Sequence, residues 1–323
     1  MSVLQTTAVG SYPKPDYLMR ARNQYRKKEI GREDLQDLER RATREWIEFQ
    51  EQIGLDILVD GEQYRGDMVE YFAEEWKGYA ISGLVRSYGN RYYHKPIIVG
   101  KVRRKGPTTV AWWKYAQGLT VKPIKGMLTG PYTLMDWSFD EYYGTRRKAA
   151  LALAQVVHDE ALDLEGAGCQ YIQIDEPAAS VVPAEIDLLI EAMAIVTQGL
   201  KAKTISHMCY GDFTTIYPRI LDLPVDQLDL EMANSNYNLL DVFKSHPYTK
   251  EIGLGLVDVH NHKLESLEEV KAGLKRAMLQ IPPEKIFPDP DCGLKTRSVA
   301  EAKAKLELVV RATREVKQEM GLD

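Results

Sequence analysis

The sequence predicts an α/β protein folded as a single (β/α)₈ barrel over residues 1–323. Short β-rich runs alternate with longer amphipathic helices, a pattern typical of parallel strands with helical crossovers. The runs number eight, and the chain exceeds the roughly 250 residues typical of such barrels by about the size of one insertion. An open, doubly wound sheet is the alternative architecture.

The predicted strands are short and separated by helical patterns. They cover residues 7–9, 56–59, 124–128, 171–174, 204–207, 227–230, 252–256 and 285–288. Apolar residues at helical spacing from Leu35 to Ile53 predict a long helix before the second strand. Later helices are predicted at 146–166, 183–199, 266–280 and 298–318. Ser266 with Glu269, and Ser298 with Glu301, form capping-box patterns that mark the starts of the last two.

The excess length lies in residues 80–122, which predict an inserted β-hairpin. Its β-rich runs are 95–102 and 108–115, joined by a basic segment that contains Gly106 and Pro107. The stretch from 76 to 135 has no Asp or Glu against eleven Lys and Arg. We expect this basic hairpin to be either a solvated loop or a face that binds an acidic partner.

The composition excludes several classes of protein. A net charge of -5 gives no general attraction to nucleic acid. No apolar run approaches the roughly 18 residues of a membrane helix, and the N-terminus lacks the pattern of a signal peptide. Three widely spaced cysteines cannot form a closed disulfide framework and suit a reducing compartment. We therefore expect a cytoplasmic protein that binds neither nucleic acid nor membrane.

Polar side chains stand at the ends of the predicted strands, where barrel enzymes place their active sites. His207 and Cys209 are two residues apart, so on an extended chain both side chains point the same way and can share one metal. Glu231 and Cys292 follow other strands and complete a set of two sulfurs, one nitrogen and one oxygen. That set predicts a catalytic zinc rather than a structural one, because it lacks the close Cys-x-x-Cys pairs of structural sites.

Over nearly its whole length, the chain resembles the catalytic half of cobalamin-independent methionine synthases, because it carries a series of their motifs in the same order. They are TAVGSYP at 7–13, VDGE at 59–62, DMVEYF at 67–72, KGMLTGP at 125–131, WSF at 137–139, IQIDEPA at 172–178, HMCY at 207–210 and DPDCGLKTR at 289–297. The resemblance implies a homocysteine S-methyltransferase that makes methionine. It also implies zinc ligands at the positions of His207, Cys209, Glu231 and Cys292.

The resemblance further implies how homocysteine is bound. Val9 and Ser11 fall where the family contacts the substrate carboxylate, and Glu62 and Asp175 where it contacts the ammonium. His260 corresponds to the family's proton-handling histidine, and Asp258, at the same strand end, is the second predicted catalytic residue. Independently of the family, a zinc-bound thiol is deprotonated at neutral pH and becomes the nucleophile.

The methyl donor is predicted to be a methylated corrinoid, either methylcobalamin or a corrinoid protein, with methyltetrahydrofolate as the less favoured donor. The chain opens almost directly on the catalytic motif at 7–13, and Val181 stands where the long family members carry an acid that contacts the pterin. A folate amine leaves only when protonated, whereas a corrinoid departs without a proton. Trp137 favours folate, because it matches a tryptophan that packs on the pterin.

Other functions remain open at this point. Another zinc-dependent thiol alkyltransferase, for example one acting on a sulfonate thiol, would need cations where this chain has Glu62 and Asp175. A zinc hydrolase could use Glu176 or His260 as its base, but two thiolate ligands lower the Lewis acidity of the metal. A zinc-stabilised scaffold without activity would not need acids at the other strand ends.

Overall fold

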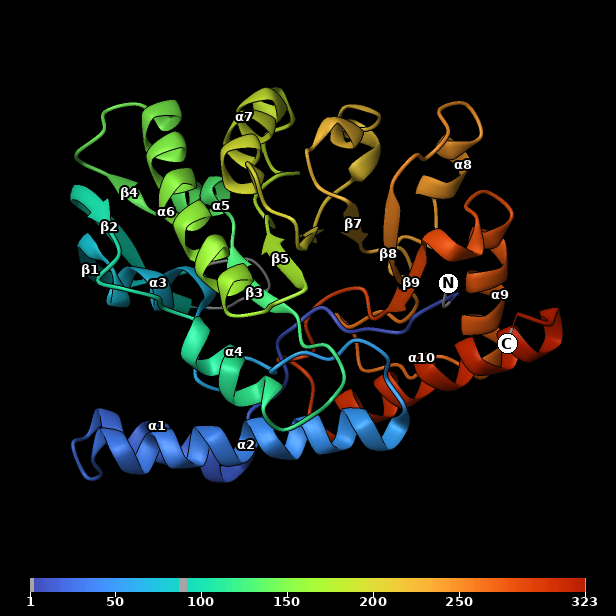
Figure 1. Ribbon diagram of the computed structural model, residues 1–323, viewed down its shortest axis with the longest axis horizontal. Coiled ribbons are helices and arrows are strands. Elements are labelled where there is room, and N and C mark those ends of the chain that lie inside the picture. The colour runs from blue at the N-terminus through green and yellow to red at the C-terminus, as the bar shows by residue number, and fades with distance from the viewer. Residues whose placement is uncertain (1–2, 87–91, 323) are drawn as a thin grey trace. The chain divides into compact units, whose positions relative to one another are not determined.

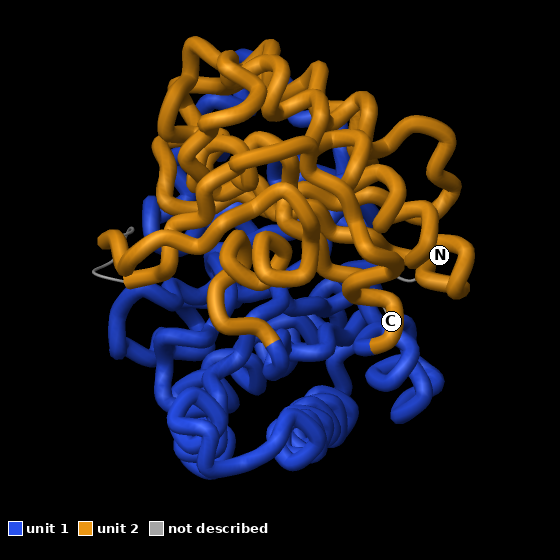
Figure 2. Tube along the Cα trace, turned by 90° about the vertical axis from the view of Figure 1, so that its left-hand side faces the viewer, with its two compact units in different colours: residues 1–64, 112–125, 227–323 blue, residues 65–111, 126–226 orange. Residues whose placement is uncertain are grey.

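The computed structural model describes residues 3–86 and 92–322. The chain divides into two compact units. Unit 1 comprises residues 1–64, 112–125 and 227–323, and unit 2 comprises residues 65–111 and 126–226 (Figure 2). Among the described residues, none of the helices combines the length and the apolar character of a membrane span.

Unit 2 contains two groups of strands with their helices. Its helices are α3 (Met68–Glu75), α5 (Pro131–Asp136), α6 (Arg146–Gly166) and α7 (Ile186–Thr197), with single turns η2 (Pro183–Glu185), η3 (Phe213–Thr215) and η4 (Arg219–Asp222). Its strands are β1 (Lys77–Arg86), β2 (Tyr92–Arg103), β3 (Gly126–Thr129), β4 (Phe139–Asp140), β5 (Tyr171–Asp175) and β6 (Lys203–Met208). Strand β5 pairs in parallel with both β3 and β6, and most residues of these three strands are buried.

The insertion contains an antiparallel pair, but its strands differ from the predicted ones. β1 pairs with β2, and the short β4 adds to β2 in parallel. The run at 108–115 was predicted as the second strand and is instead mostly part of the helix α4 (Val110–Gln117). Val110, Trp113 and Ala116 are buried at three-residue spacing, the period of a helix, so packing outweighs the β-propensity of the aromatic residues.

Unit 1 holds the N-terminal and C-terminal segments. Its helices are α1 (Asp16–Arg26), α2 (Arg32–Ile53), α8 (Leu239–Phe243), α9 (Leu267–Met278) and α10 (Val299–Met320), with the single turn η5 (Pro283–Lys285). Its strands are β7 (Gln227–Leu230), β8 (Glu251–Gly255) and β9 (Ile286–Asp289), all parallel. α1 lies alongside α2 (Figure 1), and the two share a small apolar core around Leu18 and Leu35.

Both predicted capping boxes are present. The hydroxyls of Ser266 and Ser298 accept hydrogen bonds from the amides of Glu269 and Glu301 at 3.2 Å, and each glutamate accepts from the amide of its serine. They start α9 and α10 at the predicted positions.

The predicted first and second strands are extended segments that make a few backbone hydrogen bonds rather than the ladders of full strands. The amide of Thr7 donates to the carbonyl of Pro288 on β9 (3.0 Å), and the amide of Ile57 donates to the carbonyl of Thr6 (3.0 Å). Leu58 forms an isolated parallel bridge with Ile124. The α/β class with parallel strands is therefore confirmed, and these contacts extend the β7–β8–β9 order within unit 1.

Candidate metal centre and substrate site

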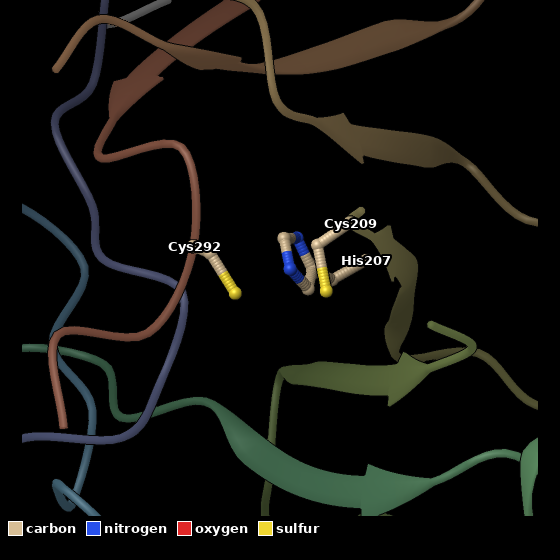
Figure 3. Close-up of side chains that lie close together, drawn as sticks. All are labelled: His207, Cys209 and Cys292. Carbon is tan, nitrogen blue, oxygen red and sulfur yellow. The ribbon is translucent and has the colours of Figure 1, made fainter. Parts of the chain in front are cut away.

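Three of the four predicted metal ligands lie together. One ligand atom from each of His207, Cys209 and Cys292 lies within 4.8 Å of the other two (Figure 3). Neither Cys209 nor Cys292 forms a disulfide bond, so both sulfurs of this group can serve as metal ligands. The group therefore offers an imidazole nitrogen and two sulfurs to one ion.

β6 positions two members of the group. His207 lies in the strand, and Cys209 directly follows the last residue of the strand. Because the two residues are two positions apart on an extended chain, both side chains point to the same side. Both are buried, with 3% and 5% of their surface exposed. The carbonyl of His207 accepts a hydrogen bond from the amide of Glu176 at 2.8 Å, which ties the end of β6 to the residue after β5.

Cys292 comes from the turn after β9 and is partly exposed. The turn packs closely on the N-terminal segment of the same unit. The amide of Leu294 donates to the carbonyl of Ser11 at 2.7 Å, and a Cβ on Gly293 would stand 2.1 Å from the Ser11 hydroxyl oxygen. The structure thus places the predicted carboxylate contact Ser11 beside the residue that follows Cys292.

Glu231, the fourth predicted ligand, is held by two neighbours in unit 1. It follows β7 and is buried, with 2% of its surface exposed. Its Oε1 lies 2.6 Å from Nε2 of His260, and its Oε2 accepts from the side-chain amide of Asn234 at 2.9 Å. The predicted proton-handling histidine therefore contacts a predicted ligand directly.

The environment of His260 favours its protonated form. Burial lowers its pKa, but the hydrogen bond to Glu231 and the negative charges of Glu231, Cys292 and Asp258 outweigh burial, so the pKa of His260 is raised above its usual value. Asp258 shapes the turn that carries this histidine. Its carboxylate accepts from the backbone amide of His260 at 2.7 Å and from the side chain of Asn261.

The predicted homocysteine contacts of unit 1 lie on two linked segments. Val9 is buried, and Ser11 is partly exposed. Glu62 is buried and has a positive φ of 53°, in a turn where its amide donates to the carboxylate of Asp60 at 2.9 Å. The amide of Tyr12 donates to the carbonyl of Gly61 at 3.1 Å, which joins the segment of Ser11 to the turn of Glu62.

Asp175, the other predicted ammonium contact, ends β5 in unit 2 and is 9% exposed. Its Oδ1 accepts from the side chain of Gln173 at 2.8 Å. The next residue, Glu176, is fully buried and accepts from the amides of Tyr132 and Thr133 and from the Thr133 hydroxyl, at 3.0, 2.7 and 2.7 Å. Burial raises the pKa of Glu176 to about 7. Its bonds cap the start of α5, so they fix the loop around Asp175.

Two side chains of this region were not predicted as site residues. The side chain of Asn234 donates a hydrogen bond to Glu231, and the only sequence signal for this contact is that Asn234 lies three residues after Glu231. Asp291 is completely buried and accepts hydrogen bonds from three backbone amides. In the sequence it is only a polar residue near a strand end, directly before Cys292. Burial raises the pKa of Asp291 to about 8, against the effect of these hydrogen bonds.

These features define an α/β protein with a candidate His-Cys-Cys metal centre and with buried carboxylates at strand ends of each unit. Residues 4–315 match the family described as "Cobalamin-independent synthase, Catalytic domain", and the chain belongs to that family. The predicted resemblance is therefore confirmed.

Similar proteins carry related names. A protein of Streptomyces griseus and one of Ralstonia pickettii are both named 5-methyltetrahydropteroyltriglutamate–homocysteine methyltransferase. Each is 40% identical to this chain, over 99% and 97% of its length, respectively. The chain spans only 43% and 42% of their lengths. A B12-independent methionine synthase from Shewanella sp. W3-18-1, solved in complex with selenomethionine, superposes with a TM-score of 0.89 at 28% identity, over the whole of both chains.

The predicted corrinoid donor is wrong, both as methylcobalamin and as a corrinoid partner protein. The matching family is cobalamin-independent, and the relatives are named for a methyltetrahydropteroyltriglutamate donor. The prediction relied on two absences, an N-terminal half and an acid at Val181. Neither absence selects a leaving group, because an acid at another position can supply the proton.

Proposed function

We propose that the chain is a zinc-dependent homocysteine S-methyltransferase whose methyl donor is a methyltetrahydropteroyl glutamate. The observation that carries the proposal is the His-Cys-Cys group, with His207 and Cys209 buried and Cys292 partly exposed, in a chain of the cobalamin-independent synthase family. The donor follows from the names of relatives that are 40% identical over nearly the whole chain.

The residues of the centre fit zinc. An imidazole and two thiolates are ligands typical of that ion. In a tetrahedral zinc site two sulfurs lie about 3.8 Å apart, since each Zn–S bond is about 2.3 Å. Ligand atoms that already lie within 4.8 Å of one another need only small shifts to reach that geometry. His207, Cys209 and Cys292 would hold the ion, and Glu231 is the proposed fourth ligand.

When bound, zinc would lower the pKa of the homocysteine thiol and supply a thiolate at neutral pH. In the transfer, the sulfur forms a bond to the methyl carbon while the carbon–nitrogen bond of the folate breaks, and the nitrogen takes up a proton. His260, with its raised pKa and its contact to Glu231, is the proposed carrier of that proton. Asp258 holds the backbone of His260 in place.

Recognition of the amino acid is assigned to the four predicted contact residues. Glu62 and Asp175 are buried acids that would bind the ammonium by charge-assisted hydrogen bonds. The Ser11 hydroxyl and the backbone at Val9 would bind the carboxylate. The two acids also explain the choice of homocysteine over anionic thiols, which they would repel.

We also propose a specific architecture for the chain, an eight-stranded barrel. We propose that the three parallel strands of each unit and the extended segments at 7–9 and 56–59 correspond to the eight strands of one barrel, which would make residues 1–323 one catalytic domain. The backbone hydrogen bonds at Thr7, Ile57 and Leu58 support this order.

The test combines metal analysis with a methyl-transfer assay. The purified chain should contain one zinc, and it should form methionine from homocysteine with monoglutamyl or triglutamyl methyltetrahydrofolate. Chelation should abolish turnover, and added zinc should restore it. A zinc-loaded chain that forms no methionine from either folate would refute the proposed reaction, and a chain that binds no zinc would refute the metal assignment.

A further inference from the structure

Asp291 makes a set of backbone contacts that the proposed reaction does not use. Its side chain is completely buried in unit 1, directly before Cys292. Its Oδ1 accepts hydrogen bonds from the amides of Met232 and Ala233, both at 2.8 Å, and its Oδ2 accepts from the amide of Asn234 at 2.7 Å. Three consecutive amides that converge on one carboxylate form an anion-binding backbone loop.

The last residue of β8 makes room for this carboxylate. A Cβ on Gly255 would stand 2.1 Å from Oδ1 of Asp291 and 2.8 Å from its Cα. The backbone amide of Asp291 also donates to the carbonyl of Val257, just beyond β8, at 3.0 Å. Hydrogen bonds therefore hold both the backbone and the side chain of Asp291. Glycine is required at position 255 because Asp291 approaches it closely, and not because of a positive φ.

The loop held by Asp291 leads directly to the proposed metal ligand. Residues 232–234 follow Glu231 in the chain, and the side chain of Asn234 donates to Glu231 Oε2 at 2.9 Å. The opposite carboxylate oxygen of Glu231 contacts His260 at 2.6 Å. A continuous set of contacts therefore runs from the residue beside Cys292, through the loop, to Glu231 and His260.

We propose that Asp291 is a positioning residue that sets the orientation of Glu231 and His260 relative to Cys292. This inference rests on the proposed function, in which Glu231 and Cys292 act on one zinc. Outer residues that orient metal ligands contribute about 10-fold to 100-fold in metal affinity or activity. A residue needed only for folding would change stability without changing either property of the folded fraction.

Three variants perturb the contacts in different ways. Asp291→Asn keeps one oxygen for the amides of Met232 and Ala233 but turns an NH₂ group toward the amide of Asn234. Gly255→Ala pushes a methyl group against the unmutated carboxylate. Asn234→Ala removes only the side-chain bond to Glu231 and keeps the three backbone bonds, so it remains informative if the other two fail to fold.

Asp56→Asn is the matched control, because the Asp56 carboxylate also accepts a backbone amide in unit 1, from Thr6 at 2.7 Å. Hydrogen exchange of the amides at 232–234, measured on the zinc-free chain, should be at least about tenfold faster in Asp291→Asn and Gly255→Ala than in the unmutated chain. Zinc affinity, measured by chelator competition, should fall about 10-fold to 100-fold in all three variants. kcat should fall more than KM for homocysteine rises.

Unchanged exchange at 232–234 in Asp291→Asn would overturn the inference, and so would faster exchange combined with an unchanged zinc affinity and kcat. The same losses in Asp56→Asn would also overturn it, because they would show a general effect of lost stability. If the unmutated chain binds no zinc, the proposed function fails, and the exchange measurement still decides separately whether Asp291 holds the loop.

Discussion

Replacing Gly293 by alanine tests the assignment of Ser11 to the homocysteine carboxylate without touching a charged group. The added Cβ would stand 2.1 Å from the Ser11 Oγ, 3.3 Å from its Cβ and 3.4 Å from its amide nitrogen. Only the hydroxyl is in severe conflict, and a serine can relieve it by rotating about χ1. We therefore expect Gly293→Ala to fold and to turn the Ser11 hydroxyl out of its present place.

The magnitude follows from the bond that this rotation removes. A hydrogen bond to a charged group contributes about 1.5–3 kcal/mol, which corresponds to a weakening of homocysteine binding by roughly 10-fold to 150-fold. The contacts with the Ser11 Cβ and amide nitrogen add a small strain, so the free energy of unfolding should fall by about 1 kcal/mol or less. Ser11→Ala should show the same loss of binding, and the double variant should lose little more than either single variant.

Steady-state kinetics and zinc analysis measure this effect. KM for homocysteine should rise while zinc content stays at the level of the unmutated chain. Gly166→Ala is the control, because a Cβ there meets nothing within 4 Å. An unchanged KM in Gly293→Ala together with a raised KM in Ser11→Ala would refute the rotation argument. An unchanged KM in both would refute the role of Ser11.

The strands that the sequence predicts well are those buried on both faces. In β5, β7 and β9 the apolar or β-branched run is short and bounded by turn residues, and the observed bounds agree within one or two residues. The segments at 7–9 and 56–59 have a similar composition but pair through only a few backbone bonds, because pairing depends on neighbours far along the chain. Composition predicts extended backbone there and cannot predict a ladder.

The helix at Val110–Gln117 shows the opposite limit. Valine, tryptophan and tyrosine favour a strand, yet the buried positions recur every third residue. In addition, the fully buried carboxylate of Glu160 accepts from the amides of Thr108 and Thr109, just before the helix begins. That partner is about fifty residues away, so local sequence carries no sign of it.

The site likewise contains features that the sequence predicts and features that it does not. The spacing of His207 and Cys209 predicts that they share one metal ion, and the strand-end rule adds Cys292, because both arguments need only the local chain and the fold class. The bonds that Glu231 makes to His260 and Asn234 depend on loop conformations after two strands. Such contacts depend on tertiary structure, which the local sequence does not determine.

Three further predictions test the centre, the fold and the substrate site. Cys209→Ser or Cys292→Ser should remove both zinc and activity, whereas Cys169→Ser, at a buried thiol outside the group, should keep both; full zinc in either ligand variant would contradict the assignment. Because burial raises the pKa of Glu39 from 4.5 to about 7, the folded chain keeps a proton that the unfolded chain releases at lower pH. The free energy of unfolding should therefore fall by up to about 3 kcal/mol as pH rises from 4.5 to 7, and Glu39→Gln should abolish this part of the pH dependence in urea titrations. Asp175→Asn should weaken homocysteine binding by about 2–5 kcal/mol and leave zinc in place, because it removes one partner of the ammonium from a buried site. The unmutated enzyme should accordingly discriminate against an analogue that lacks the amino group, and the variant, which keeps Glu62, should lose part of that discrimination. Equal use of homocysteine and the analogue by the unmutated enzyme would show that Asp175 does not bind the ammonium.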